Sequence, residues 1–170
     1  SMWKTVESLK EGKTDICLSA GNTGALLVIS RLLIKTIEGI SKPALAGLWP
    51  NQNNMNVVLD LGANIECNEK NLVDFACMGS AFCQSIFDIE KPKISLLNVG
   101  LEEYKGNDIL KKTFAILKEN KMKNFDFTGY IEGNHIMDGN TDVIVTDGFT
   151  GNIALKTAEG TANFSFYFLL

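Results

Sequence analysis

The chain has 170 residues, of which 45% are hydrophobic and 21% are charged, as is typical of a globular protein with a buried core. The formal net charge of −4 argues against a general nucleic-acid-binding protein. The most apolar stretch, ALLVISRLLI at 25–34, is too short to span a bilayer and contains Arg31.

Short apolar strands alternate with helices along the chain. The predicted helices cover 2–11, about 69–87, about 107–119 and a last segment that begins at Ile153, and another helix is opened by the turn at 20–24 and stops near Gly39. The predicted strands cover 15–18, 56–60, 94–98, 125–131 and 142–145, and residues 43–49 are expected to be extended. This alternation is typical of βαβ units, which build a mostly parallel sheet with helices on both faces. We therefore predict one three-layer α/β/α domain over residues 1–170.

Four predicted strands end in polar turns that contain glycine. These turns are SAGNTGA at 19–25, LDLGANIE at 59–66, LNVGLEEYKGN at 97–107 and VTDGFTGN at 145–152. Parallel strands would bring all four turns to one edge of the sheet, where open α/β sheets bind ligands. Two of the turns lead directly into helices, whose first N–H groups and dipole favour an anion. The sequence therefore predicts a phosphate cradle at this edge.

The glycine turns are also consistent with a purely structural role, because turns of this kind after strands serve as ordinary helix caps. The patterns GxxxxGK[ST] and GxGxxG do not occur, which disfavours nucleotide hydrolysis and dinucleotide binding. GxSxG does not occur either, which disfavours a serine hydrolase. The four cysteines lack CxxC spacing and there is one histidine, His135, so we predict no metal site and interpret the cysteines as thiols.

The same turns carry a family resemblance. SAGNTGA, LDLGAN, LLNVG followed by KGN, and DVIVTDGFTGN followed by EGTA occur in order along the chain. Together they resemble the bacterial phosphate acyltransferases (PlsX) of phospholipid synthesis. The resemblance implies a fold similar to the isocitrate and isopropylmalate dehydrogenases and the phosphotransacetylases. It also implies an enzyme that makes acyl phosphate from acyl-[acyl-carrier protein] and inorganic phosphate, without a cofactor.

The resemblance also implies partners and a place in the cell. Members are cytoplasmic or membrane-associated homodimers that pass acyl phosphate to a membrane glycerol-phosphate acyltransferase. Acyl-carrier protein is acidic, so its docking on this acidic chain needs a local basic surface. The richest lysine cluster, which is equally typical of a solvated helix face, comprises Lys111, Lys112, Lys118, Lys121 and Lys123.

Site residues follow by matching the motifs. Lys105 would place its charge near the phosphate or the oxyanion, and Asn152 would donate its side-chain amide. The expected phosphate-binding residues are Ser19, Gly21, Asn22, Thr23, Gly24, Asn64, Gly106, Asn107, Asp147, Gly148, Thr150 and Gly151. A carboxylate that pointed inward would repel phosphate, so we expect Asp147 to cap its helix instead.

The chain departs from the family pattern in length and at some positions. Members are roughly twice as long, Leu101 replaces a residue that is more often polar, and NFSFYFLL does not follow the usual continuation after EGTA. We therefore expect a fragment that exposes apolar surface, including Phe164, Phe166, Tyr167 and Phe168, and self-associates. Two alternatives remain: a phosphotransacetylase-like enzyme that uses acyl-CoA, or an inactive truncated remnant.

Overall fold

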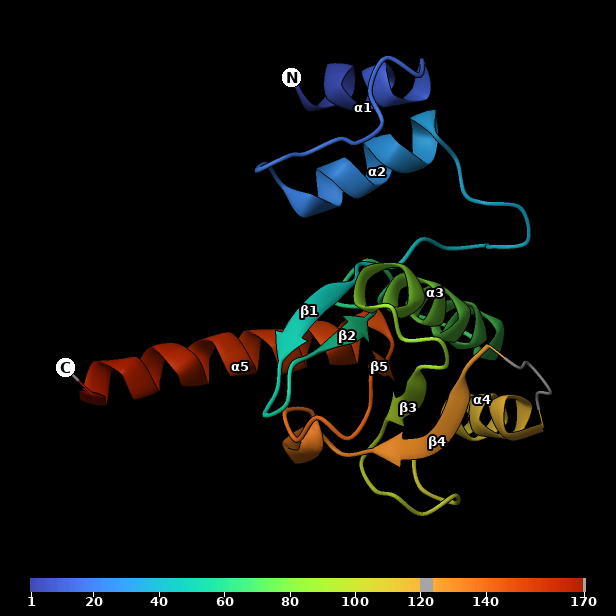
Figure 1. Ribbon diagram of the computed structural model, residues 1–170, viewed down its shortest axis with the longest axis vertical. Helices are drawn as coiled ribbons and strands as arrows, with labels where there is room; N and C mark the ends of the chain where they lie inside the picture. The colour runs from blue at the N-terminus through green and yellow to red at the C-terminus, as the bar shows by residue number, and fades with distance from the viewer. Residues whose placement is uncertain (120–123, 170) are drawn as a thin grey trace. The chain divides into compact units, whose positions relative to one another are not determined.

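The computed structural model describes residues 1–119 and 124–169, and its contacts divide the chain into two compact units, Ser1–Pro43 and Ala44–Leu170. Figure 1 labels the helices and strands of both units. The expectation that residues 1–170 form a single domain stays a prediction.

The first unit is helical. Helix α1 (Met2–Lys10) packs against helix α2 (Thr23–Leu33), and Val6 is buried between them. The predicted strand at 15–18 is wrong, because this segment has no strand neighbour to take its N–H and C=O groups. Helix α2 ends at Leu33 rather than near Gly39, since Lys35 adopts a left-handed backbone with φ 69°.

The second unit is built on a five-stranded sheet in the order β1-β2-β5-β3-β4. The strands are β1 (Gly47–Pro50), β2 (Met55–Leu59), β3 (Lys93–Leu97), β4 (Asp126–Ile131) and β5 (Val143–Val145). β1 pairs antiparallel with β2, and the other neighbouring pairs are parallel. The mostly parallel sheet is therefore confirmed, with β5, the last strand in the sequence, at its centre.

Helices cover both faces of this sheet, as the three-layer prediction requires (Figure 1). Helices α3 (Glu69–Phe87) and α4 (Asp108–Glu119) pack on one face through a core that includes Leu72, Phe75 and Leu117. Helix α5 (Gly148–Leu169) covers the other face, where Leu155 and Ala158 pack against a second core. A short 3-10 helix, η1 (Gly133–His135), follows β4.

Local sequence explains where the helices begin. Asn68 and Asn71 form a reciprocal capping box at the start of α3, each side chain accepting the other's backbone N–H. Helix α5 begins at Gly148 rather than at Ile153. The motif TDGFTGN is thus mostly the first helical turn and not a loop that precedes it, which decides how its residues are presented.

Candidate functional site

The carboxyl ends of four parallel strands meet at one edge of the second unit. The helices that follow β2 and β3 lie on one face of the sheet, and the helix that follows β5 lies on the other. β5 lies between β2 and β3 in the sheet. The chain therefore leaves β5 toward one face and leaves each of its two neighbours toward the other face. Open α/β sheets bind their ligands in the crevices that such divergence creates.

Asp60 organises the turn after β2. Its side chain is fully buried, and its Oδ1 accepts the backbone N–H groups of Leu45 (3.1 Å), Gly62 (3.1 Å) and Ala63 (2.8 Å). Its Oδ2 accepts the backbone N–H (2.8 Å) and the side-chain Nδ2 (2.7 Å) of Asn64. One carboxyl group thus fixes the whole turn.

The start of α5 rests on this turn. The Gly148 N–H donates to the Asn64 carbonyl (2.8 Å), and Asn152 Nδ2 donates to the Leu61 carbonyl (3.3 Å). A Cβ at Gly148 would lie 2.5 Å from the Asn64 oxygen, and one at Gly151 would overlap the Asp60 carbonyl oxygen. The glycines of TDGFTGN are therefore needed for close packing of two backbones.

Asp147 caps α5, as expected. Its Oδ1 accepts the Thr150 backbone N–H (2.8 Å), and its Oδ2 accepts the Thr150 hydroxyl (2.9 Å). An acidic cap stabilises a helix start but competes with an anionic ligand for the same donors. The beginning of α5 is thus less suited to phosphate than the sequence indicates.

Asn98 holds the turn after β3. Its side chain is only 7% exposed, and Nδ2 donates to the carbonyls of Gly100 (3.1 Å) and Lys105 (3.3 Å). Gly106 has φ 87°, and a Cβ there would lie 2.5 Å from Asn98 Oδ1. The Asn98 amide therefore holds both ends of the loop in place by hydrogen bonds, and only glycine fits at position 106 beside it.

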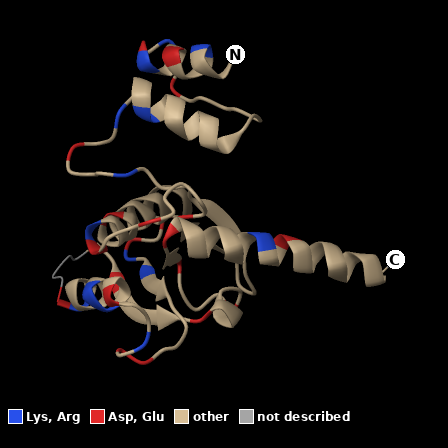
Figure 2. Ribbon diagram, turned by 180° about the vertical axis from the view of Figure 1, so that it is seen from behind, with Lys and Arg blue, Asp and Glu red and all other residues tan. Residues whose placement is uncertain are grey.

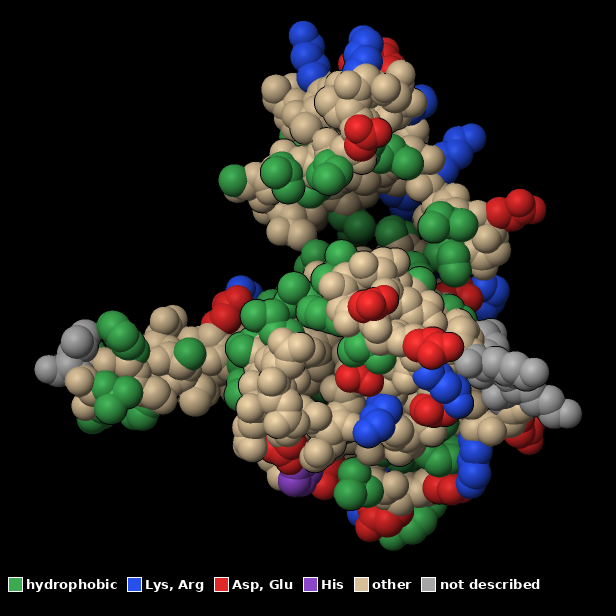
Figure 3. All heavy atoms as spheres, viewed as in Figure 1, with side chains coloured by type: hydrophobic (Ala, Val, Ile, Leu, Met, Phe, Trp, Pro, Cys, Tyr) green, Lys and Arg blue, Asp and Glu red, His purple; other side chains and the backbone are tan. Residues whose placement is uncertain are grey.

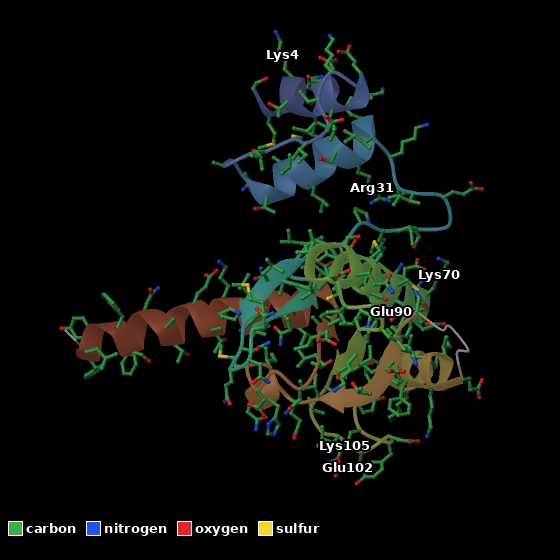
Figure 4. The ribbon with its side chains drawn as sticks, in the orientation of Figure 1. Lys4, Arg31, Lys70, Glu90, Glu102 and Lys105 are labelled. Atoms are coloured by element: carbon green, nitrogen blue, oxygen red, sulfur yellow. The ribbon has the colours of Figure 1, made fainter. Side chains whose placement is uncertain are left out.

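This loop leads into α4. Asn107 Oδ1 accepts the Leu110 N–H (2.9 Å), which makes Asn107 the cap of the helix. Lys105 is exposed near the tip of the loop, with its Nζ 5.8 Å from the centre of the Tyr104 ring. Figure 4 shows Lys105 and Glu102 together at this outer end. The lysine stands next to Gly106 but its side chain does not face inward.

A pocket of about 620 Å³ opens beside the α4 and α5 starts. Polar residues from the turns after β3 and β5 line it, namely Asn98, Gly106, Asn107, Asp147 and Thr150. Leu97, Val99, Leu110, Ile153, Ala154 and Gly133 complete the lining. Its volume falls within the range of small-molecule sites, and it occupies the crevice between β3 and β5.

Four of the predicted site residues, Gly106, Asn107, Asp147 and Thr150, therefore line one pocket. Three others form the backbone support behind it, since Asn64, Gly148 and Gly151 are the contacts between the β2 turn and α5. Lys105 and Asn152 are not among the lining residues. Within the described conformation, Asn152 faces the β2 turn and Lys105 faces solvent, so their catalytic roles stay predictions.

The remaining predicted residues lie in the first unit. Ser19 Oγ accepts the Gly21 N–H (3.2 Å), and Asn22 caps α2 by accepting the Ala25 N–H (3.0 Å). Thr23 and Gly24 form the first turn of α2. Because no strand precedes them, the prediction that four turns follow parallel strands is wrong for this one. Their part in phosphate binding stays a prediction.

Sequence reasoning noted the turns but missed Asp60 and Asn98, the two buried polar side chains that shape them. The available signal was a short polar residue directly after an apolar strand, in VVLD and SLLN. Such a residue is well placed to satisfy the N–H groups of the turn that it begins.

The thiols and the histidine lie outside this pocket. All four cysteines are free, and burial, with a further contribution from the Asp142 charge, raises the pKa of the Cys83 thiol to about 12. A thiol with so high a pKa is a poor nucleophile. His135 Nδ1 pairs instead with Asp138 Oδ2 (2.7 Å). Across residues 1–119 and 124–169, no three metal-binding side chains gather into a cluster.

The fold belongs to the class of α/β proteins that have a mostly parallel sheet, helices on both faces and a pocket at the carboxyl edge of the strands. Solved structures share this fold. A phosphotransacetylase from Streptococcus pyogenes matches with a TM-score of 0.71 at 21% identity, covering 94% of this chain and 54% of that chain. The EutD phosphotransacetylase from Staphylococcus aureus matches with a TM-score of 0.70 at 18% identity, covering 95% and 56%.

Sequence comparison then shows the family. The model described as "Fatty acid synthesis protein" matches residues 1–169, and the chain belongs to this family. A phosphate acyltransferase from Pelagibacter ubique is 61% identical over 96% of this chain and 49% of its own length. Another from Chelativorans sp. is 48% identical over 95% and 46%. The chain thus spans about half the length of these relatives.

Among the described residues, no helix is both long enough and apolar enough to cross a membrane.

Proposed function

We propose that the protein takes part in phosphate acyltransfer, in which inorganic phosphate and acyl-[acyl-carrier protein] give acyl phosphate and free carrier protein for phospholipid synthesis. The observation that supports this best is the pocket at the carboxyl edge, which gathers Gly106, Asn107, Asp147 and Thr150 in a chain 61% identical to a phosphate acyltransferase.

The α4 start is the better place for phosphate. Asn107 accepts the N–H groups of Leu110 and Lys111, which leaves those of Asp108 and Ile109 as the donors that precede them at the helix start. The side chain that caps α4 is a neutral amide, with the Asp108 carboxyl group in the first turn after it, whereas the α5 donors are bonded directly by the capping carboxylate of Asp147. Lys105, two residues before Asn107, would swing inward to add its charge.

The reaction needs alignment more than base catalysis, because phosphate is already an anion at neutral pH. A phosphate oxygen attacks the thioester carbonyl, a C–O bond forms and the carbonyl oxygen becomes an oxyanion. The C–S bond then breaks, and the proton from phosphate ends on the departing thiolate. Lys105 and Asn152 are assigned to the phosphate and the oxyanion, where a single donor is typically worth about 3–4 kcal/mol.

Lys105→Ala and Asn152→Ala test these roles. Each should lower acyl phosphate formation by about a hundredfold or more, measured with radiolabelled phosphate in this protein and at the equivalent positions of a full-length relative. Lys91→Ala is the matched control, since Lys91 forms an exposed ion pair with Asp126 away from the pocket. Normal rates in both site variants, with folding intact, would contradict the assignment.

The acyl donor separates this proposal from its alternative. Carrier protein requires a basic docking surface, and Lys111, Lys112 and Lys118 lie on α4, which also carries the acidic residues Asp108 and Glu119 at its ends. Figure 2 shows basic and acidic positions mixed along the ribbon of the second unit. Lys118 is paired with Glu103 (2.6 Å), and Lys121 and Lys123 lie outside the described residues. The same assay with acyl-CoA in place of acyl-carrier protein distinguishes a phosphotransacetylase-like activity, and turnover with neither donor would indicate an inactive remnant.

A further inference from the structure

A second pocket, of about 450 Å³, adjoins the one described above. Leu72 and Cys67, at 2% and 9% exposure, form its buried part. Ile109 and Leu110 of α4 line it further, and Ile65 and Phe149 stand at its rim. Four side chains from α3, α4 and α5 and two from the turn between β2 and α3 thus make an apolar lining.

The rim is unusual for a surface in water. Ile65 is 61% exposed and Phe149 is 57% exposed, although both border a hollow. Exposed apolar side chains that surround a cavity mark a place where an apolar ligand can remove them from water. Covering them would gain about 25 cal/mol for each Å² of apolar surface removed from water.

The two pockets share one wall. Asn107, Leu110, Asp147 and Thr150 line both of them, so the starts of α4 and α5 form their common wall. Asn98 and Gly106 line only the first pocket, whereas Ile65, Leu72 and Phe149 line only the second. Glu66 also lines the second pocket, and its carboxyl group disfavours an anion there. A ligand with an anionic end and an apolar tail fits the pair.

We propose that the second pocket holds the hydrocarbon chain of the acyl group while its carbonyl carbon meets phosphate at the α4 start. This inference rests on the proposed function, whose site it extends. It assigns a substrate-binding role to Ile65, Leu72, Ile109 and Phe149, none of which was among the expected site residues.

Straight-chain alkyl phosphonates from butyl to decyl test the proposal, because each joins an anion to an apolar tail and cannot react. Their dissociation constants are measured by calorimetry with the 170-residue protein, below the concentration at which the ligands aggregate. Affinity should rise about fourfold for each added methylene group until the pocket is filled. An affinity that is independent of chain length would overturn the proposal.

Ile65→Trp tests whether the tail enters this pocket. The substitution enlarges an already exposed side chain at the rim and should narrow the space that is left for an alkyl chain. Ile86→Trp is its match, since Ile86 is 59% exposed on α3 and does not line the pocket. Ile65→Trp should weaken decyl phosphonate at least tenfold and butyl phosphonate by a smaller factor, while Ile86→Trp changes neither. Equal effects of the two variants would overturn the assignment.

Phe149→Ser provides a second, independent variant, because it removes the opposite side of the rim without filling the pocket. It should also weaken the longest phosphonate more than the shortest. Inorganic phosphate as a competitor separates this proposal from the proposed function. Failure of phosphate to displace butyl phosphonate would count against the anion site, whereas loss of the chain-length dependence alone would count against the acyl pocket.

Discussion

Asp60 satisfies five N–H groups from one buried position, which ties the end of β2 to the loop that supports α5. In Asp60→Asn, the amide keeps one oxygen, so at least two of these donors face an NH2 group instead of an acceptor. Because a buried unsatisfied donor costs about 1–3 kcal/mol, the free energy of unfolding should fall by about 2–4 kcal/mol.

Denaturant unfolding monitored by circular dichroism measures this change. Asp126→Asn is the matched control, because the exposed Asp126 forms an ion pair with Lys91 at the surface, where such pairs contribute about 0–1 kcal/mol. Equal changes in the two variants would contradict the role of Asp60 as the organiser of the turn.

At the level of single residues, the role of Asp147 as a helix cap could be predicted from the sequence, whereas the directions in which the Lys105 and Asn152 side chains point could not. Asp147 could be predicted to cap its helix, because a carboxylate that pointed inward would repel phosphate. Asn22 was expected to bind phosphate, but its side chain caps α2 by accepting the Ala25 N–H. The outward position of Lys105 and the bond from Asn152 to Leu61 could not be predicted. Both depend on how loops distant in sequence pack, which local patterns do not encode.

Helix α5 combines two different surfaces. Its first half packs on the sheet through Leu155 and Ala158, whereas every described residue after Ala158 is exposed. Four of these are aromatic, and the rings of Phe164 and Phe168 lie 4.7 Å apart on one side of the helix. Figure 3 shows hydrophobic side chains gathered at this outer end. Apolar surface of this kind favours association.

We therefore predict that the 170-residue protein self-associates through this end of α5. Light scattering should show a mass that rises with concentration, and the double variant Phe164→Ser with Phe168→Ser should lower it. Ile116→Ser, which removes an exposed apolar side chain from α4, should leave the mass unchanged. A constant monomer mass for the unmodified protein across the micromolar range would show that the prediction is wrong.

In the second unit, local sequence patterns were sufficient to predict where most helices and strands lie. The helix over 69–87 was predicted with its observed bounds, because an asparagine cap and a long apolar period coincide there. The strands of this unit that follow β1 lie within a residue of their predicted bounds. The segment 15–18 has an equally apolar pattern but forms no strand, since a strand also requires a neighbour that its own sequence cannot supply.

Across the second unit, the candidate site depends on the order of the strands. β5 lies between β2 and β3, so segments about 50 and 90 residues apart in sequence share its two crevices. The sequence predicted a parallel sheet with ligands at its carboxyl edge. It could not predict this strand order, because every order that obeys right-handed crossovers is consistent with the same local patterns.

Phosphate titration followed by amide NMR tests the central claim most directly. Saturable shifts should appear at Gly106 and Asn107, which line the pocket, and at Asp108 and Ile109, whose N–H groups begin α4 beside it, and Lys105→Ala should weaken them. Chloride at equal ionic strength is the control for a general salt effect. The absence of saturable shifts at these four amides, in a protein whose spectrum shows it to be folded, would contradict a phosphate site at this edge of the sheet.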